Sequence, residues 1–231
     1  MIPLLLLISL FLFLYCVFVL AKDDFLLLRK NVTLEQLFNV SFLSFFGGLF
    51  LSRLVFVLEH AKAAYLNPLV FFLFSYFPGL SITGGIFGAT LVLWVYTGRK
   101  KIPFGRILDI FSVSFFFSWS AGLFLNFIIS LALTHHIGFP LLFSSIAFFC
   151  LFLLFIWLFA TGKLKDGNIG FIGFAMFAIV QFASSMLARG PKNYVSFTIE
   201  DVLLIFLFLG FIGMYIQQET LGGFYKHMKK R

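Results

Sequence analysis

The chain has 231 residues, of which 61% are hydrophobic and 11% are charged, with a formal net charge of +8. This composition excludes a water-soluble globular protein, because so few polar residues cannot cover an apolar core. We therefore expect an integral membrane protein in which residues 1–231 form a single membrane domain, with no sizeable soluble domain.

Seven apolar segments follow one another along the chain and are typical of membrane-spanning helices. The predicted fold class is all-α, a polytopic membrane protein with seven transmembrane helices. A shorter apolar run near 67–80 is bounded by Pro68 and Pro78, which predicts a re-entrant or interfacial segment. The seven predicted helices cover residues 2–21, 34–58, 82–97, 107–130, 140–161, 168–187 and 199–217.

The basic residues predict how the chain is oriented in the membrane. Thirteen of the seventeen Lys and Arg residues fall in connections 22–30, 98–106 and 162–167 or in the tail 218–231. The positive-inside rule places these on the cytoplasmic side, so the N-terminus lies outside and the C-terminus inside. No basic residue precedes segment 2–21, which favours a retained span over a cleaved signal peptide.

Several compositional features indicate no separate chemistry. The 38 Phe residues are expected among lipid-facing side chains, where Phe and Leu are nearly interchangeable. Cys16 and Cys150 lie inside apolar runs, so we predict neither a disulfide nor a metal site, and no cofactor. The basic tail indicates attraction to anionic lipid and no nucleic-acid partner.

Arg53 is the one basic residue well inside an apolar segment. One interpretation is that it extends to the headgroups from the outer end of its helix; the other makes it a ligand of a lipid phosphate. The predicted topology brings Arg53, Gly84, Gly85, Asn126 and Arg189 to the outer-leaflet boundary. Exposed backbone N–H groups at a helix start favour an anion site, although glycines there also permit close helix packing.

The order of these residues resembles the phosphatidylglycerol–prolipoprotein diacylglyceryl transferases of bacterial membranes. The likeness covers most of the chain. It rests on SRLVFV at 52–57, NPL at 67–69, TGGIFG at 83–88, where the family has H-G-G-L-x-G, and the basic RKK at 99–101 followed by IPF. The spacing from Thr83 to Asp109 also fits the family spacing from its His to its Asp.

The resemblance also identifies positions at which this chain departs from the family motifs. The motif His is Thr83, and the motif G-R-x-G-N-F-x-N-x-E falls on GLFLNFIISL at 122–131, where only Asn126 and Phe127 are kept after the first Gly. The motif Arg therefore falls on Leu123, and the last Asn and Glu fall on Ile129 and Leu131. Of two family Arg residues seven positions apart, the later matches Arg189 and the earlier falls on Phe182.

The family activity transfers the diacylglyceryl group of phosphatidylglycerol to the lipobox cysteine thiol of prolipoproteins. The resemblance implies a multi-pass protein of the bacterial plasma membrane, with a phospholipid and prolipoprotein signal peptides as partners. Two hypotheses stay open. In the first, the chain is a working transferase whose base is unknown, with His135 or His136 as a displaced candidate. In the second, it is a catalytically inactive protein that binds a lipid or a partner.

Overall fold

The computed structural model describes residues 2–60, 79–134, 138–189 and 197–228, and within these ranges all regular structure is helical. Each of the seven predicted segments is a helix, which confirms the all-α class. The predicted segment 67–80 lies outside the described residues except for Gly79 and Leu80. The helices are α1 (Ile2–Ala21), α2 (Phe25–Arg29), α3 (Leu34–His60), α5 (Ile82–Lys100), α6 (Phe104–Thr134), α7 (Phe139–Thr161), α8 (Asn168–Arg189) and α9 (Ile199–Met228).

Six of these helices are long and apolar enough to cross a membrane: α1, α3, α6, α7, α8 and α9. The chain is therefore a multi-pass membrane protein. Helix α5, with 19 residues, is long enough but is not among these six, because it is less apolar. It has three glycines near its start and Arg99 and Lys100 in its last turn. A seventh span at α5 and the orientation of the bundle remain predictions.

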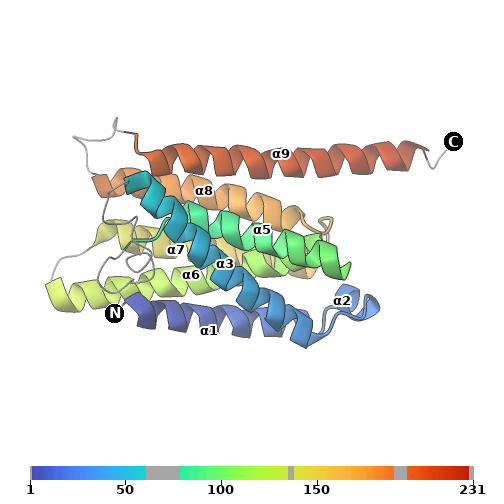
Figure 1. The fold of residues 1–231 in the computed structure, drawn as a ribbon, viewed down its shortest axis with the longest axis horizontal. Coiled ribbons are helices and arrows are strands. Elements are labelled where there is room, and N and C mark those ends of the chain that lie inside the picture. Colours follow the sequence, from blue (N-terminus) through green and yellow to red (C-terminus); the bar gives the residue numbers. More distant parts are fainter. Residues whose placement is uncertain (1, 61–78, 135–137, 190–196, 229–231) are drawn as a thin grey trace.

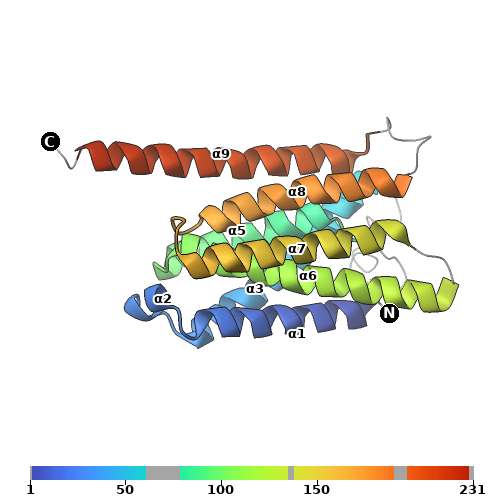
Figure 2. The same cartoon turned by 180° about the vertical axis from the view of Figure 1, so that it is seen from behind.

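The long helices run side by side along one axis, with α1 at one edge of the bundle and α9 at the other (Figures 1 and 2). Helix α1 packs on α6, α3 on α5, α6 on α7 and α8, and α8 on α9. The α1–α3, α5–α6 and α7–α8 connections and the end of α9 lie at one end of the bundle (Figure 1). The fold thus collects the basic connections at this end, which we call the basic end.

Close packing between α3 and α5 depends on glycines in both helices. A Cβ at Gly88 would lie 2.7 Å from the carbonyl oxygen of Gly47, and a Cβ at Gly84 would lie 2.8 Å from that of Leu51. A Cβ at Gly48 would approach the Gly85 carbonyl to 3.0 Å. These glycines therefore let the two backbones touch, which confirms the packing role predicted for the glycines at the start of α5.

Aromatic side chains fill the core between α6, α7 and α8. Phe116 stacks on Phe148 and Phe155 at centroid distances of 6.1 and 5.4 Å, and Phe148 stacks on Phe177 at 5.2 Å. All four rings are at most 1% exposed. The expectation that the Phe residues face lipid was wrong for this group, because a flat ring fills an interhelical space as readily as it meets acyl chains.

Buried carboxylates hold the helices and their connections together at the basic end. Asp109 on α6 accepts the backbone N–H groups of Gly167 and Gly170 at 2.7 and 2.8 Å, at the start of α8. Asp24, between α1 and α2, pairs with Arg106 of α6 at 2.7 Å. The helix starts and the connections are thereby held by side chains from neighbouring helices.

Candidate functional site

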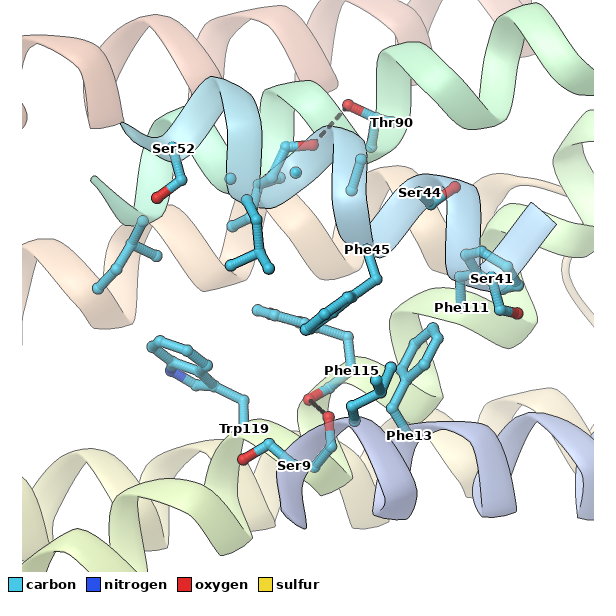
Figure 3. Close-up of a pocket in the computed structure, with 18 of the residues that line it drawn as sticks. Ser9, Phe13, Ser41, Ser44, Phe45, Ser52, Thr90, Phe111, Phe115 and Trp119 are labelled. Carbon is cyan, nitrogen blue, oxygen red and sulfur yellow. Dashed lines mark hydrogen bonds between the residues drawn. The ribbon is translucent and has the colours of Figure 1, made fainter. Parts of the chain in front are cut away.

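A cavity of about 270 Å³ lies between α1, α3, α5 and α6, with Phe174 of α8 also in its wall. Figure 3 shows Phe45 of α3 directed across it toward Phe115 of α6 and Phe13 of α1. Each described residue of the wall is either apolar, a glycine, a serine or a threonine, so the described lining carries no ionisable side chain. The space is therefore suited to an alkyl chain.

Three hydroxyl groups of the wall are satisfied within their own helices. Ser41 donates to the carbonyl of Leu37 at 2.7 Å, and Thr90 donates to that of Ile86 at 2.8 Å. Ser118 of α6 bonds to a carbonyl in the same way. Because these hydroxyls turn back to the backbone, they present little unmet polarity to an occupant.

Two polar atoms of lining residues are exceptions. Ser44 Oγ and Trp119 Nε1 are buried and have no hydrogen-bond partner within the described part of the chain. A buried polar group without a partner costs about 1–3 kcal/mol, so such groups are uncommon in folded proteins. An oxygen atom of a bound molecule could satisfy either one.

At one end of the cavity, α3 and the start of α5 form a polar cluster. Ser52 Oγ donates to the carbonyl of Ser81 at 2.7 Å, and the Ser81 hydroxyl lies 2.9 Å from that of Thr83. The Ser81 hydroxyl also donates to the Glu59 carboxylate at 3.3 Å. Thr83, which the sequence resemblance aligns with the family histidine, is 4% exposed and is hydrogen-bonded to Ser81.

Arg53 lies beside this cluster and is wholly buried, with 0% exposure. Its Nη1 donates to the carbonyl of Gly79 at 2.8 Å, and its guanidinium carbon lies 5.5 Å from the centre of the Phe56 ring. The side chain therefore does not extend to the surface, and the headgroup-snorkelling interpretation was wrong. Its predicted contact with a lipid phosphate stays a prediction.

Arg189 is held by a buried carboxylate. Its guanidinium contacts both oxygens of Asp201, at 2.6 and 2.7 Å, and also donates to Ser185 and Thr198. Asp201 is 0% exposed. The positive charge of Arg189 is therefore largely compensated inside the protein, and a phosphate would have to compete with Asp201 for it.

Two further carboxylates lie at the start of α5, where an anion site was predicted. Glu200 of α9 lies near the backbone N–H of Ile82 and close enough to Glu59 for their charges to interact. The N–H of Gly85 already bonds to the carbonyl of Ser81. A phosphate at this helix start would meet two acidic groups, a feature that the sequence reasoning missed.

The remaining predicted positions lie elsewhere on the bundle. Of the predicted binding residues, only Gly85 is among the described residues that line the cavity. Asn126 is half-buried on α6, and Leu123 packs at the edge of the core. His135 and His136 lie outside the described residues. Ile129 is half-buried, Leu131 is exposed, and Phe182 stacks on Phe197 at 6.4 Å.

These features define a polytopic helical membrane protein with an apolar internal cavity that ends in a hydroxyl and carboxylate cluster. The family model for prolipoprotein diacylglyceryl transferase matches residues 3–217, and the chain belongs to this family. Among curated proteins, no relative matches it. The family match confirms the predicted resemblance and indicates a lipid-utilising membrane protein with a phospholipid substrate.

Proposed function

We propose that this chain binds a membrane phospholipid on the diacylglyceryl transferase scaffold without transferring its diacylglyceryl group at a rate that sustains lipoprotein biosynthesis. The observation that carries the proposal is Thr83. It occupies the position of the motif histidine and is a buried hydroxyl that is hydrogen-bonded to Ser81.

The transfer reaction needs a base for the lipobox thiol. A thiol is a poor nucleophile until its proton is removed or its thiolate is stabilised, and this is more difficult in an apolar site. The Thr83 hydroxyl cannot accept the proton near neutral pH. Glu59 lies two hydrogen bonds away, through Ser81, beside the acidic Glu200.

The reaction also needs fixed positive charge for the leaving glycerol phosphate. Guanidinium groups supply this charge well because they form two parallel hydrogen bonds in a low-dielectric site. Here the motif arginine is replaced by Leu123, which packs on the core, and Arg189 is paired with Asp201. Arg53 is the remaining described cation beside the cluster, and its Nη1 donates to the carbonyl of Gly79. Glu59 and Glu200 add negative charge at the start of α5.

Lipid binding is supported by the cavity. Its apolar wall favours an acyl chain, since each buried methylene contributes about 0.8 kcal/mol. Ser44 Oγ and Trp119 Nε1 have no partner among the described residues, and both can donate a hydrogen bond to an ester oxygen of a glycerolipid. Phosphatidylglycerol is the lipid that the family resemblance implies.

The second candidate function is the family reaction itself, a working transferase that acts on prolipoprotein signal peptides. Family membership and the buried guanidinium of Arg53 favour it. In that case His135 or His136 would supply the base. Both candidates share a topology of seven spans in the bacterial plasma membrane, with the N-terminus outside and the basic end in the cytoplasm.

A depletion experiment separates the two candidates. The resident transferase is removed from a bacterium that requires it, this chain is expressed as the sole copy, and lipobox precursors are followed by mass. We expect unmodified precursors and no growth, while the resident enzyme on the same vector restores both. Growth with normally lipidated precursors would overturn the proposal, and His135→Ala and His136→Ala would then locate the base.

Lipid binding is tested separately by filling the cavity. Ala89→Leu places a larger side chain in the wall, and we expect the purified protein to retain several-fold less phospholipid by mass spectrometry. Gly98→Leu is the matched control, because it adds the larger side chain on the same helix where a Cβ meets nothing within 4 Å. Equal lipid retention in both variants would place the lipid outside the cavity.

A further inference from the structure

Helix α2 presents apolar side chains outward at the basic end. Phe25 is 77% exposed and Leu28 is 60% exposed, whereas Leu27 between them is 1% exposed. Residues three apart share one face of a helix, so Phe25 and Leu28 form one outward apolar pair. Leu27 packs into the core, which fixes the direction of this pair.

The segment is firmly attached to the bundle. Asp24 caps α2 by accepting the backbone N–H groups of Leu26 and Leu27 at 3.1 and 3.0 Å. The same carboxylate, in a residue that is 5% exposed, pairs with Arg106 of α6 at 2.7 Å. After the helix, the N–H of Val32 bonds to the carbonyl of Leu27 at 3.0 Å. The apolar pair is therefore held in place by the fold.

Basic side chains flank the pair on both sides. Lys22 precedes α2, and Arg29 and Lys30 end it, and all three are exposed. Lys22 pairs with Asp23 at 3.7 Å, and this exposed pair holds its partners weakly. The surface of α2 therefore combines two apolar side chains with a local excess of positive charge.

We propose that α2 is a membrane-interface anchor for anionic phospholipid. It directly follows the span α1, so it lies at the depth where the hydrocarbon core ends and the headgroups begin. There Phe25 and Leu28 enter the acyl boundary, and Lys22, Arg29 and Lys30 bind headgroup phosphates. A binding site for another protein would not require this match of charge to the leaflet surface.

The experiment introduces a fluorescent indole on α2 in the full-length protein. Phe25→Trp is reconstituted in nanodiscs of phosphatidylcholine with or without phosphatidylglycerol, and the lipids carry brominated acyl chains. The parent protein, with its three native Trp residues, gives the background to subtract. We expect the brominated lipids to lower the emission of the introduced indole at least twofold relative to the same lipids without bromine. An unquenched signal would place α2 in water or against another protein and would overturn the proposal.

Charge reversal tests the lipid class. We expect Arg29→Glu with Lys30→Glu to lower the phosphatidylglycerol retained by the purified protein about twofold or more and to abolish any phosphatidylglycerol dependence of the quenching. Lys163→Glu, an exposed change at the same end, is the control and should alter neither readout. Unchanged retention in the double variant, with its normal elution in size-exclusion chromatography, would overturn the anionic specificity.

Discussion

The two ends of the bundle use the same residue types for different purposes. At the basic end, Asp109 and the Asp24–Arg106 pair tie helix starts and connections together, and the basic sequence RKK at 99–101 matches the family pattern. At the opposite end, the sequence resemblance predicts reactive positions at Thr83 and Leu123, while Arg189 is paired with Asp201. The described ionic contacts of the basic end support the fold, and the proposed loss of transfer chemistry concerns the opposite end.

This difference shows which buried charges the fold needs. Each buried ion costs several kcal/mol to desolvate, so it persists only with a partner or a function. Asp109 has two backbone N–H partners, and Asp201 has Arg189 and Thr198. Carboxylates with such partners have a structural reason to persist even if transfer activity is lost.

The largest expected effect is at Asp109. Asp109→Ala leaves the backbone N–H groups of Gly167 and Gly170 without their acceptor at a buried helix start, which should lower the free energy of unfolding by about 3 kcal/mol. Thermal unfolding of the purified protein in detergent measures this loss. Asp109→Asn keeps one acceptor oxygen and should lose less. A melting temperature equal to that of the parent in both variants would contradict a structural role.

The second prediction concerns the opposite end. Arg189→Met leaves Asp201 buried without its cation and should cost about 2–3 kcal/mol in unfolding free energy, while retained lipid stays constant. Asp201→Asn added to Arg189→Met should recover part of the loss, because the unpaired charge is removed. Loss of lipid without loss of stability would instead give Arg189 the phosphate-binding role of the family.

The third prediction concerns the packing of α3 on α5. Gly88→Ala places a Cβ 2.7 Å from the Gly47 carbonyl oxygen, so the helices must separate, and we expect a loss of about 1–2 kcal/mol in unfolding free energy. Gly98→Ala meets nothing within 4 Å and should be neutral or slightly stabilising through helix propensity. Equal unfolding temperatures for the two variants would show that this crossing can loosen at little cost.

The helices were predictable from the sequence because the apolar runs are long and separated by Pro, Gly or charged residues. Helix α2 was missed, since FLLLR is too short to show a periodicity; the available signal was Asp24, which has the position and side chain of an N-cap. The burial of Phe116 and Phe148 could not be predicted, because Phe suits both lipid and core. Even so, the match to family motifs was sufficient to identify the family.

The candidate site was predicted less completely because it depends on contacts between distant parts of the chain. Glu59 and Glu200 are 141 positions apart in sequence, yet both lie at the start of α5. The pairing of Arg189 with Asp201 had a sequence signal, since the two residues flank one short connection between apolar segments. The cavity wall had none, because serines and apolar residues occur throughout the helices.

The last prediction concerns Arg53, where we expect the smallest change. If this guanidinium still holds a lipid phosphate, Arg53→Ala should lower the anionic lipid retained by the purified protein about threefold, whereas Arg53→Lys should retain an intermediate amount, since Lys keeps the charge without the two-pronged geometry. Quantitative lipid mass spectrometry on correctly eluting protein provides the measurement. Because Arg53 also bonds to the Gly79 carbonyl, both variants should unfold at a lower temperature whether or not lipid is bound. The retention of anionic lipid therefore decides between the two roles of Arg53. If both variants retain as much anionic lipid as the parent, Arg53 supports the fold, as Asp109 does. The opposite end of the bundle then holds no described cation available to a phosphate.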